Sequence, residues 1–131
     1  MNNEIRKIIN KSTFHIEKGK FIYAQVDGAP NITDHFMVTR DDNEITVVTE
    51  KKNLTKLNII ERNKDNYKLI ALNVSIPFYS VGFLAAVSEA IAKAGMNILI
   101  VSTYSKDYVM VKDDRLDDAR KVLLDLGFTE K

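Results

Sequence analysis

Cysteine is absent from the 131-residue sequence, and histidine occurs only twice. The absence of cysteine excludes disulfides, thiolate metal sites and a cysteine nucleophile. His15 and His35 are isolated and have no metal-ligand spacing around them, so we expect each to be solvated or bonded locally. The sequence also contains no P-loop and no dinucleotide-binding fingerprint. We therefore expect no metal and no other cofactor.

An excess of charge of one sign is absent as well. The 19 Lys and Arg residues nearly balance the 18 Asp and Glu residues, and the two signs are interspersed along the chain. Nucleic acid and anionic membranes are therefore not expected partners. Acidic residues cluster at 41–44 and at 113–118. We interpret these clusters as a hairpin turn and a helix start, where negative charge complements the helix dipole, rather than as cation sites.

Long apolar runs are missing too. No stretch approaches the roughly 18 apolar residues of a membrane span, and residues 1–7 lack the apolar core of a secretion signal. A cytoplasmic protein is therefore expected. The composition, 45% hydrophobic and 28% charged, is typical of a globular protein. The length fits one ordinary domain or two very small modules.

The C-terminal half has the clearest pattern. Residues 67–76 alternate as a strand, which Pro77 ends because proline cannot donate to a sheet. Ser80 is a suitable N-cap for a helix over residues 81–94, which Gly95 ends. The expected buried stripe of this helix is Leu84, Val87, Ile91 and Ala94.

The remaining C-terminal elements complete a repeat of strands and helices. Residues 97–104 and 107–112 form a predicted hairpin, and a second helix follows the acidic residues and ends at Gly127. Residues 128–129 begin a last short strand. The expected inner stripe of the second helix is Leu116, Ala119, Leu123 and Leu126. The order β-α-β-β-α-β predicts a four-stranded antiparallel sheet with both helices on one face.

The N-terminal half is rich in strand signals. Two hairpins are predicted, residues 13–17 with 20–26 across Lys18-Gly19, and residues 36–40 with 44–50. Short helical turns are expected at residues 31–35 and 53–58, and a strand is expected at residues 59–62. Three isoleucines near the start, Ile5, Ile8 and Ile9, allow either a short helix or a frayed end. The polar segment 63–66 predicts two domains, residues 1–63 and 64–131.

Four stretches of the C-terminal half, residues 76–88, 94–98, 102–104 and 107–112, resemble the ACT domain family. The run Ile-Pro-Phe-Tyr-Ser-Val-Gly-Phe-Leu-Ala-Ala-Val-Ser resembles the first loop and helix of that domain. The whole looks like small bacterial tandem-ACT proteins, relatives of aspartate kinase regulatory regions and arginine sensors. The resemblance implies an α+β, ferredoxin-like fold with two ACT-like units in tandem, often as a homodimer. It also implies a non-catalytic role, in which an amino acid binds between units and regulates a partner.

The resemblance places ligand contacts in three segments. The residues implied are Ser80, Val81, Gly82, Phe83, Asn97, Ile98, Tyr104 and Asp107. The first four lie at a helix start, whose unpaired amides and dipole favour a carboxylate. Family members often carry an acidic residue in the turn after the tyrosine. This chain has Ser105-Lys106 there, which weakens the case for a basic ligand.

Each of these residues also has a purely structural interpretation. Gly82 either admits a ligand or allows close helix packing, and Asn97 either binds a ligand or caps the turn after Gly95. Asp107 either takes a ligand ammonium or bonds local backbone. Phe78 and Tyr79 are expected either in a pocket wall, in a dimer contact or in the core.

Three other functions compete with sensing. A structural dimerisation module is not separable from a sensor by sequence. An acylphosphatase-like enzyme on this scaffold needs an arginine in the first loop, and residues 75–82 contain no basic residue. An RNA-binding sheet needs exposed aromatic residues on its central strands, whereas Leu99 and Val101 are aliphatic.

Overall fold

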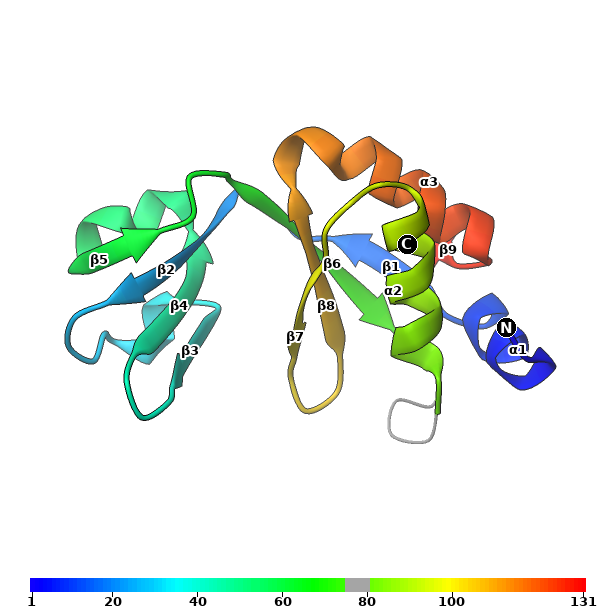
Figure 1. The fold of residues 1–131 in the computed structure, drawn as a ribbon, viewed down its shortest axis with the longest axis horizontal. Helices are drawn as coiled ribbons and strands as arrows, with labels where there is room; N and C mark the ends of the chain where they lie inside the picture. The colour runs from blue at the N-terminus through cyan, green and yellow to red at the C-terminus, as the bar shows by residue number, and fades with distance from the viewer. Residues whose placement is uncertain (75–80) are drawn as a thin grey trace. The chain divides into compact units, whose positions relative to one another are not determined.

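The computed structural model describes residues 1–74 and 81–131, which form two compact units (Figure 1). Unit 1 consists of Met1–Glu17 and Leu69–Lys131, and unit 2 consists of Lys18–Lys68. The units therefore do not coincide with the expected division into residues 1–63 and 64–131. The first 17 residues pack with the C-terminal half because their strand, β1 (Thr13–Ile16), pairs with β6 (Tyr67–Asn73).

Unit 1 contains a mixed sheet in the strand order β9-β1-β6-β8-β7. Its other strands are β7 (Leu99–Ser102), β8 (Asp107–Lys112) and β9 (Thr129–Glu130). β1 runs antiparallel to β6 and parallel to β9. The predicted β-α-β-β-α-β order is confirmed. The predicted sheet of four antiparallel strands is wrong, because β1 lies between β6 and β9.

The predicted hairpin across Lys18-Gly19 is also wrong. Both of its strands exist, but β1 pairs within unit 1, whereas β2 (Phe21–Val26) pairs with strands of unit 2. Burial of Phe14 explains the choice of partner. This side chain is fully buried in β1 and packs edge-on against Phe128, with ring centroids 6.4 Å apart.

Three helices pack on one face of the unit 1 sheet (Figure 1). They are α1 (Asn3–Asn10), α2 (Phe83–Lys93) and α3 (Leu116–Leu126), the last preceded by the short 3-10 segment η4 (Asp113–Arg115). The core joins their apolar residues to alternate residues of the strands: Ile5, Ile9, Phe14, Ile70, Leu72, Phe83, Val87, Ile91, Val109, Val111, Ala119 and Leu123. The prediction that both C-terminal helices share one face is confirmed, and the uncertain N-terminal segment is a helix.

The start of α2 differs from the prediction. The helix begins at Phe83 with Gly82 as its N-cap, and the expected cap, Ser80, lies outside the described residues. The inner stripe is Phe83, Val87 and Ile91. Leu84 and Ala94 were expected inside and are exposed. The reason is the rotation of the helix, because burial of Phe83 turns the next residue toward solvent.

The other face of this sheet is buried too. Leu69 and Ala71 alternate with the helix-facing residues of β6 and are fully buried, and Met110 of β8 is 1% exposed. Tyr108 lies on the same face of β8, where burial raises the pKa of its hydroxyl and the Glu17 carboxylate adds to the effect. The unit 1 sheet is therefore apolar on both faces along β6 and β8.

Unit 2 is an antiparallel sheet in the order β3-β4-β2-β5. Its other strands are β3 (Met37–Arg40), β4 (Ile45–Glu50) and β5 (Ile59–Arg62). The predicted hairpin of β3 and β4 is confirmed, as are both helical turns, η1 (Ile32–Asp34) and η2 (Lys51–Lys56). Its core is small: Ile22, Ala24, Val26 and Val47, with Leu54, Leu57 and Ile59 packed against it.

The two units share a strand plan. In each, the first strand of the motif pairs with the third, and the third pairs with the second: β6-β8-β7 in unit 1 and β2-β4-β3 in unit 2. Unit 2 has 3-10 turns where unit 1 has α-helices. Among residues 1–74 and 81–131, no helix combines the length and apolar character that crossing a bilayer requires.

Candidate functional site

The first turn of α2 forms one side of the candidate site. Its N-cap, Gly82, has a left-handed backbone, with φ of 88°, and provides no side-chain cap. The first hydrogen bond inside the helix joins the Ala86 amide to the Gly82 carbonyl, at 3.0 Å. The amides of Phe83, Leu84 and Ala85 therefore have no acceptor within the helix. These amides form the positive end of the helix dipole, which favours the binding of an anion.

Gly82 is not closely packed by the residues that the structure describes. Among them, the nearest atom that a Cβ at this position would meet is Cγ1 of Ile5, at 4.0 Å. Close packing against these residues is therefore not what requires a glycine here. The backbone conformation requires it instead, because side chains with a Cβ rarely adopt a positive φ. A small molecule can approach the helix start at this point.

The turn between β7 and β8 forms the other side. It is closed by the Thr103 amide, which donates to the Lys106 carbonyl at 2.8 Å. Ser102 donates from its hydroxyl to the Asp107 carboxylate at 2.6 Å. Asp107 thus bonds a nearby side-chain hydroxyl and not the local backbone that the sequence suggested. A carboxylate has about four acceptor positions, and one bond leaves capacity for another donor.

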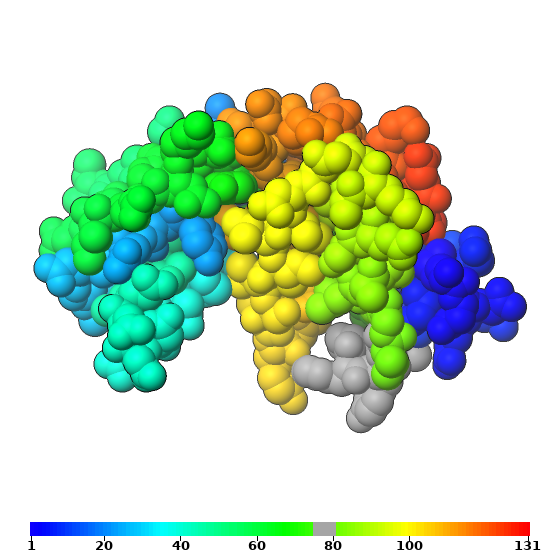
Figure 2. All heavy atoms as spheres, viewed as in Figure 1, coloured from blue at the N-terminus to red at the C-terminus, as the bar shows by residue number. Residues whose placement is uncertain are grey.

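Between these two segments lies a groove of about 470 Å³, which we name the α2–hairpin groove. Its lining is formed by residues 82–85 and 102–107, all of unit 1. Both segments lie at the same edge of this unit in Figure 2, the turn in yellow and the first turn of α2 in light green. The volume is within the roughly 300–1,000 Å³ typical of small-molecule pockets.

The groove brings together half of the residues that the resemblance implied. Gly82, Phe83, Tyr104 and Asp107 line it, and Tyr104 is 85% exposed. Ser80 lies outside the described residues, as do Phe78 and Tyr79.

The other implied residues lie outside the lining of the groove. Val81 is 88% exposed, Asn97 is exposed, and Ile98 packs against the core. Within the described chain the Asn97 side chain makes no hydrogen bond, so it does not cap the preceding turn either. The predicted contact at residues 97–98 therefore has no counterpart in this groove.

Sequence reasoning did not assign several lining residues to the site. Leu84 and Ala85 are two of them. Leu84 was missed because it was expected in the core. Ser102 and Thr103, which the resemblance places in one cluster with Tyr104 and Asp107, line the groove as well. Ser105 and Lys106 also line it and were not assigned to the site.

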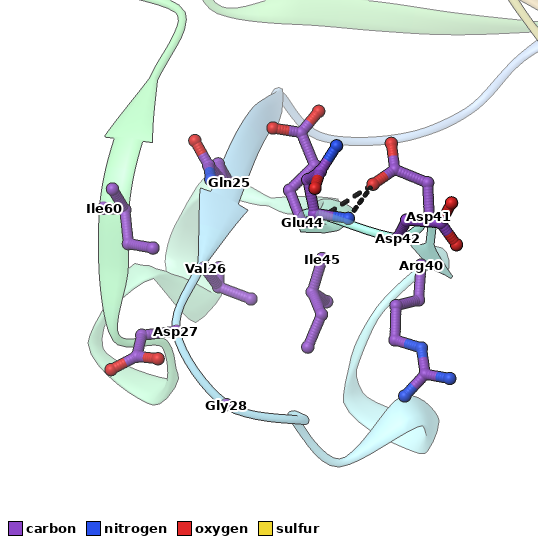
Figure 3. A pocket seen from close by; sticks show the side chains of 11 residues that line it. Gln25, Val26, Asp27, Gly28, Arg40, Asp41, Asp42, Glu44, Ile45 and Ile60 are labelled. Carbon is purple, nitrogen blue, oxygen red and sulfur yellow. Dashed lines mark hydrogen bonds between the residues drawn. The ribbon is translucent and has the colours of Figure 1, made fainter.

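Unit 2 contains a second hollow, of about 480 Å³, between the end of β2 and the β3–β4 turn (Figure 3). Its charged lining residues are Asp27, Arg40, Asp41, Asp42 and Glu44. Figure 3 shows the carboxylates of Asp27, Glu44 and Asp41 on different sides of the hollow. Asp41 accepts the amides of Asn43 and Glu44, at 2.8 and 2.9 Å, which is the hairpin-turn role expected from the sequence.

Both histidines have hydrogen-bond partners. His15 Nε2 lies 3.0 Å from a Glu17 carboxylate oxygen, a local partner as predicted. The other contacts are not local: His15 Nδ1 lies 3.1 Å from the Asn73 amide nitrogen, and His35 Nδ1 lies 2.9 Å from the Thr49 hydroxyl. In the part of the chain that the structure describes, no three His, Asp or Glu side chains are placed to hold a metal ion.

Comparison with known proteins supports the family resemblance. Residues 63–125 match the family model of the ACT domain. No curated protein matches the sequence. Among solved structures, VC0802 of Vibrio cholerae, a protein of unknown function and possible transport protein, has a TM-score of 0.79 at 19% identity. That match covers 95% of this chain and 96% of that one.

Two further structures have the same fold. Protein Atu0741 of Agrobacterium tumefaciens has a TM-score of 0.75 at 18% identity, with 92% of each chain covered. The ligand-free regulatory subunit of aspartate kinase from Thermus thermophilus has a TM-score of 0.61 at 12% identity, with 86% of this chain and 96% of that one covered. The fold is thus α+β with a mixed sheet, and these three structures share it. Residues 63–125, which include α2, β7, β8 and most of α3, are therefore similar to the ACT domain.

Proposed function

We propose that this protein is a non-catalytic sensor that binds an α-amino acid in the α2–hairpin groove and regulates a partner. One observation carries the proposal: the groove has unpaired helix amides on one side and the Asp107 carboxylate on the other. An α-amino acid has a carboxylate and an ammonium two bonds apart. The amides of residues 83–85 suit the carboxylate, and Asp107 suits the ammonium.

Energetics are compatible with a sensor. A site with millimolar to micromolar affinity needs about 4–8 kcal/mol of net binding free energy. A few charge-assisted hydrogen bonds, each contributing about 1.5–3 kcal/mol, reach that range with partial burial of a small ligand. Such an affinity lets occupancy follow the concentration of a metabolite.

A regulatory role is favoured over catalysis by the groove and by the fold. The described lining contains no histidine, and its one hydroxyl–carboxylate pair, Ser102 with Asp107, has no further base to orient it. The fold resembles that of an aspartate kinase regulatory subunit. Homodimerisation and a cytoplasmic location belong to the same proposal.

A thermal-shift screen of the full chain against the twenty amino acids tests the proposal. A ligand at 100 times its Kd adds about 2.7 kcal/mol to the free energy of unfolding. We expect at least one amino acid to raise the melting temperature. If none does so at millimolar concentration, the sensor proposal fails and a structural module is the better account.

A pair of glycine variants tests the location. Gly82→Val places a branched side chain at the helix start and is expected to abolish the shift. Gly95→Val is the matched control, because Gly95 also has a positive φ, of 79°, with nothing within 4 Å, and it lies outside the groove. Both variants carry a backbone strain of roughly 1–2 kcal/mol, so only the loss of ligand response separates them. A response that survives in Gly82→Val would place the site elsewhere.

A further inference from the structure

The ionisable groups of the α2–hairpin groove indicate which class of amino acid it would accept. Lys106 lines the groove and is half-buried. Its ammonium makes no hydrogen bond or ion pair with any described residue. An ammonium that pairs with no described residue is available to a ligand anion, and such a charge-assisted bond is favourable.

The neighbouring carboxylate does not neutralise this lysine. Asp107 bonds to the Ser102 hydroxyl and forms no ion pair with Lys106. The two charges follow each other in sequence at the start of β8 and both line the groove. The groove therefore offers separate positive and negative groups in addition to the helix amides.

The charges of the groove can be compared with those of possible ligands. Lys106 contributes +1, Asp107 contributes −1, and a helix N-terminus contributes roughly +0.5, so the sum is positive. A neutral amino acid uses the amides and Asp107 and leaves Lys106 without a partner. A basic side chain adds a second cation beside Lys106. An acidic side chain gives the ligand a net charge of −1 and a partner for the lysine.

We propose, on the basis of the function proposed above, that the groove selects an α-amino acid with an anionic side chain, the aspartate or glutamate class. Lys106 is the specificity-determining residue, and it pairs with the side-chain carboxylate. Ser105 lines the groove beside it and provides a hydroxyl donor for the same group, whereas the Thr103 hydroxyl donates to the Lys106 carbonyl at 3.3 Å. Asp107 and the helix amides hold the ammonium and the α-carboxylate.

Isothermal titration calorimetry of the full chain tests this selectivity. L-glutamate and L-aspartate are compared with L-glutamine and L-asparagine, which have nearly the same size without the side-chain charge, and with L-lysine. We expect an acidic amino acid to bind about tenfold or more tightly than its amide, because one charge-assisted bond is lost. The preference should decrease with added salt.

Three variants locate the selectivity. Lys106→Gln should lower the affinity for the acidic amino acid about tenfold and leave the affinity for the corresponding amide unchanged. Lys106→Glu should reverse the order, so that L-lysine binds more tightly than L-glutamate. Lys11→Glu makes the same change in charge on an exposed residue of unit 1 outside the groove, and it should keep the wild-type order.

The outcomes separate this inference from the proposed function. If the wild-type protein binds the amides or L-lysine as tightly as the acidic amino acids, the selectivity is overturned and the sensor function stands. Equal weakening of L-glutamate and L-glutamine by Lys106→Gln also overturns it. If the wild-type protein binds no amino acid at all, the proposed function fails as well. A variant that does not fold leaves the wild-type comparison of acid with amide decisive.

Discussion

Unit 1 and unit 2 place their strands in the same relative order, yet they cover their sheets differently. Unit 1 packs three α-helices on one face of its sheet, whereas unit 2 has two 3-10 segments of three and six residues. The strand order does not depend on helix length, because it is set by which apolar strand residues are buried together. The same strand order is therefore compatible with α-helices in unit 1 and with short 3-10 segments in unit 2.

The same comparison explains why unit 1 has the better candidate site. In unit 2 the Asn31 side chain accepts the Thr33 amide at 3.2 Å, so the short helical segment is capped by the protein itself. In unit 1 the cap is Gly82, which has no side chain to offer. A ligand can therefore take the place that an asparagine occupies in unit 2.

The charges differ as well. The hollow of unit 2 has four carboxylates and one arginine, whereas the α2–hairpin groove has one carboxylate and one lysine. An anionic ligand is opposed in the first and favoured in the second. Two hollows of nearly equal volume, about 480 and 470 Å³, are thus expected to behave differently.

The largest expected effect tests which residues belong to unit 1. Phe14→Ala should lower the free energy of unfolding by about 3–5 kcal/mol, because a fully buried aromatic side chain is lost. Denaturant titration measures this decrease in the free energy of unfolding. Native-state hydrogen exchange should show that Thr129 and Lys131, whose amides donate to Ser12 and Phe14, lose protection first.

Ile22→Ala is the matched variant in unit 2, where Ile22 is also fully buried. It should release the amides paired between β2 and β4 before those of β9. If Phe14→Ala released the β2–β4 amides first, the assignment of the first 17 residues to unit 1 would be contradicted.

A smaller effect tests how unit 2 is stabilised without α-helices. Asn53 is 7% exposed and donates to the Asp34 carbonyl at 3.0 Å and to the Thr49 hydroxyl at 2.9 Å, which joins η2 to η1 and β4. Asn53→Ala should cost about 1–3 kcal/mol, because buried acceptors lose their donor. Thermal unfolding of Asn58→Ala, at an exposed position, should differ from the wild type by less than about 0.5 kcal/mol. Equal stabilities of the two variants would show that the polar network contributes nothing.

Much of the fold could be predicted from local patterns. The alternation in β6, the predicted hairpin of residues 97–104 and 107–112, and the glycine after α3 agree with the structure. The partner of β1 could not be predicted in this way. Lys18-Gly19 is a good local turn signal, and Gly19 does have a positive φ, of 90°. Pairing with β6 and β9 depends instead on burial of Phe14 against Phe128, more than a hundred residues later.

The candidate site was predictable only in part. Gly82 and Asp107 came from a resemblance in sequence, and both line the groove. Leu84 was missed because burial of Phe83 sets the rotation of α2 and turns the next side chain outward. The role proposed for Lys106 depends on its half-buried position and its lack of a partner, and neither property can be read from sequence.

The location of the site is the central claim, and an NMR titration of the full chain with L-glutamate tests it most directly. The account predicts that amide shifts concentrate at residues 83–85 and 102–107, while the β3–β4 turn at residues 40–45 stays unchanged. Shifts centred on residues 40–45, or no shifts at millimolar L-glutamate and at millimolar concentrations of the other amino acids, would contradict it.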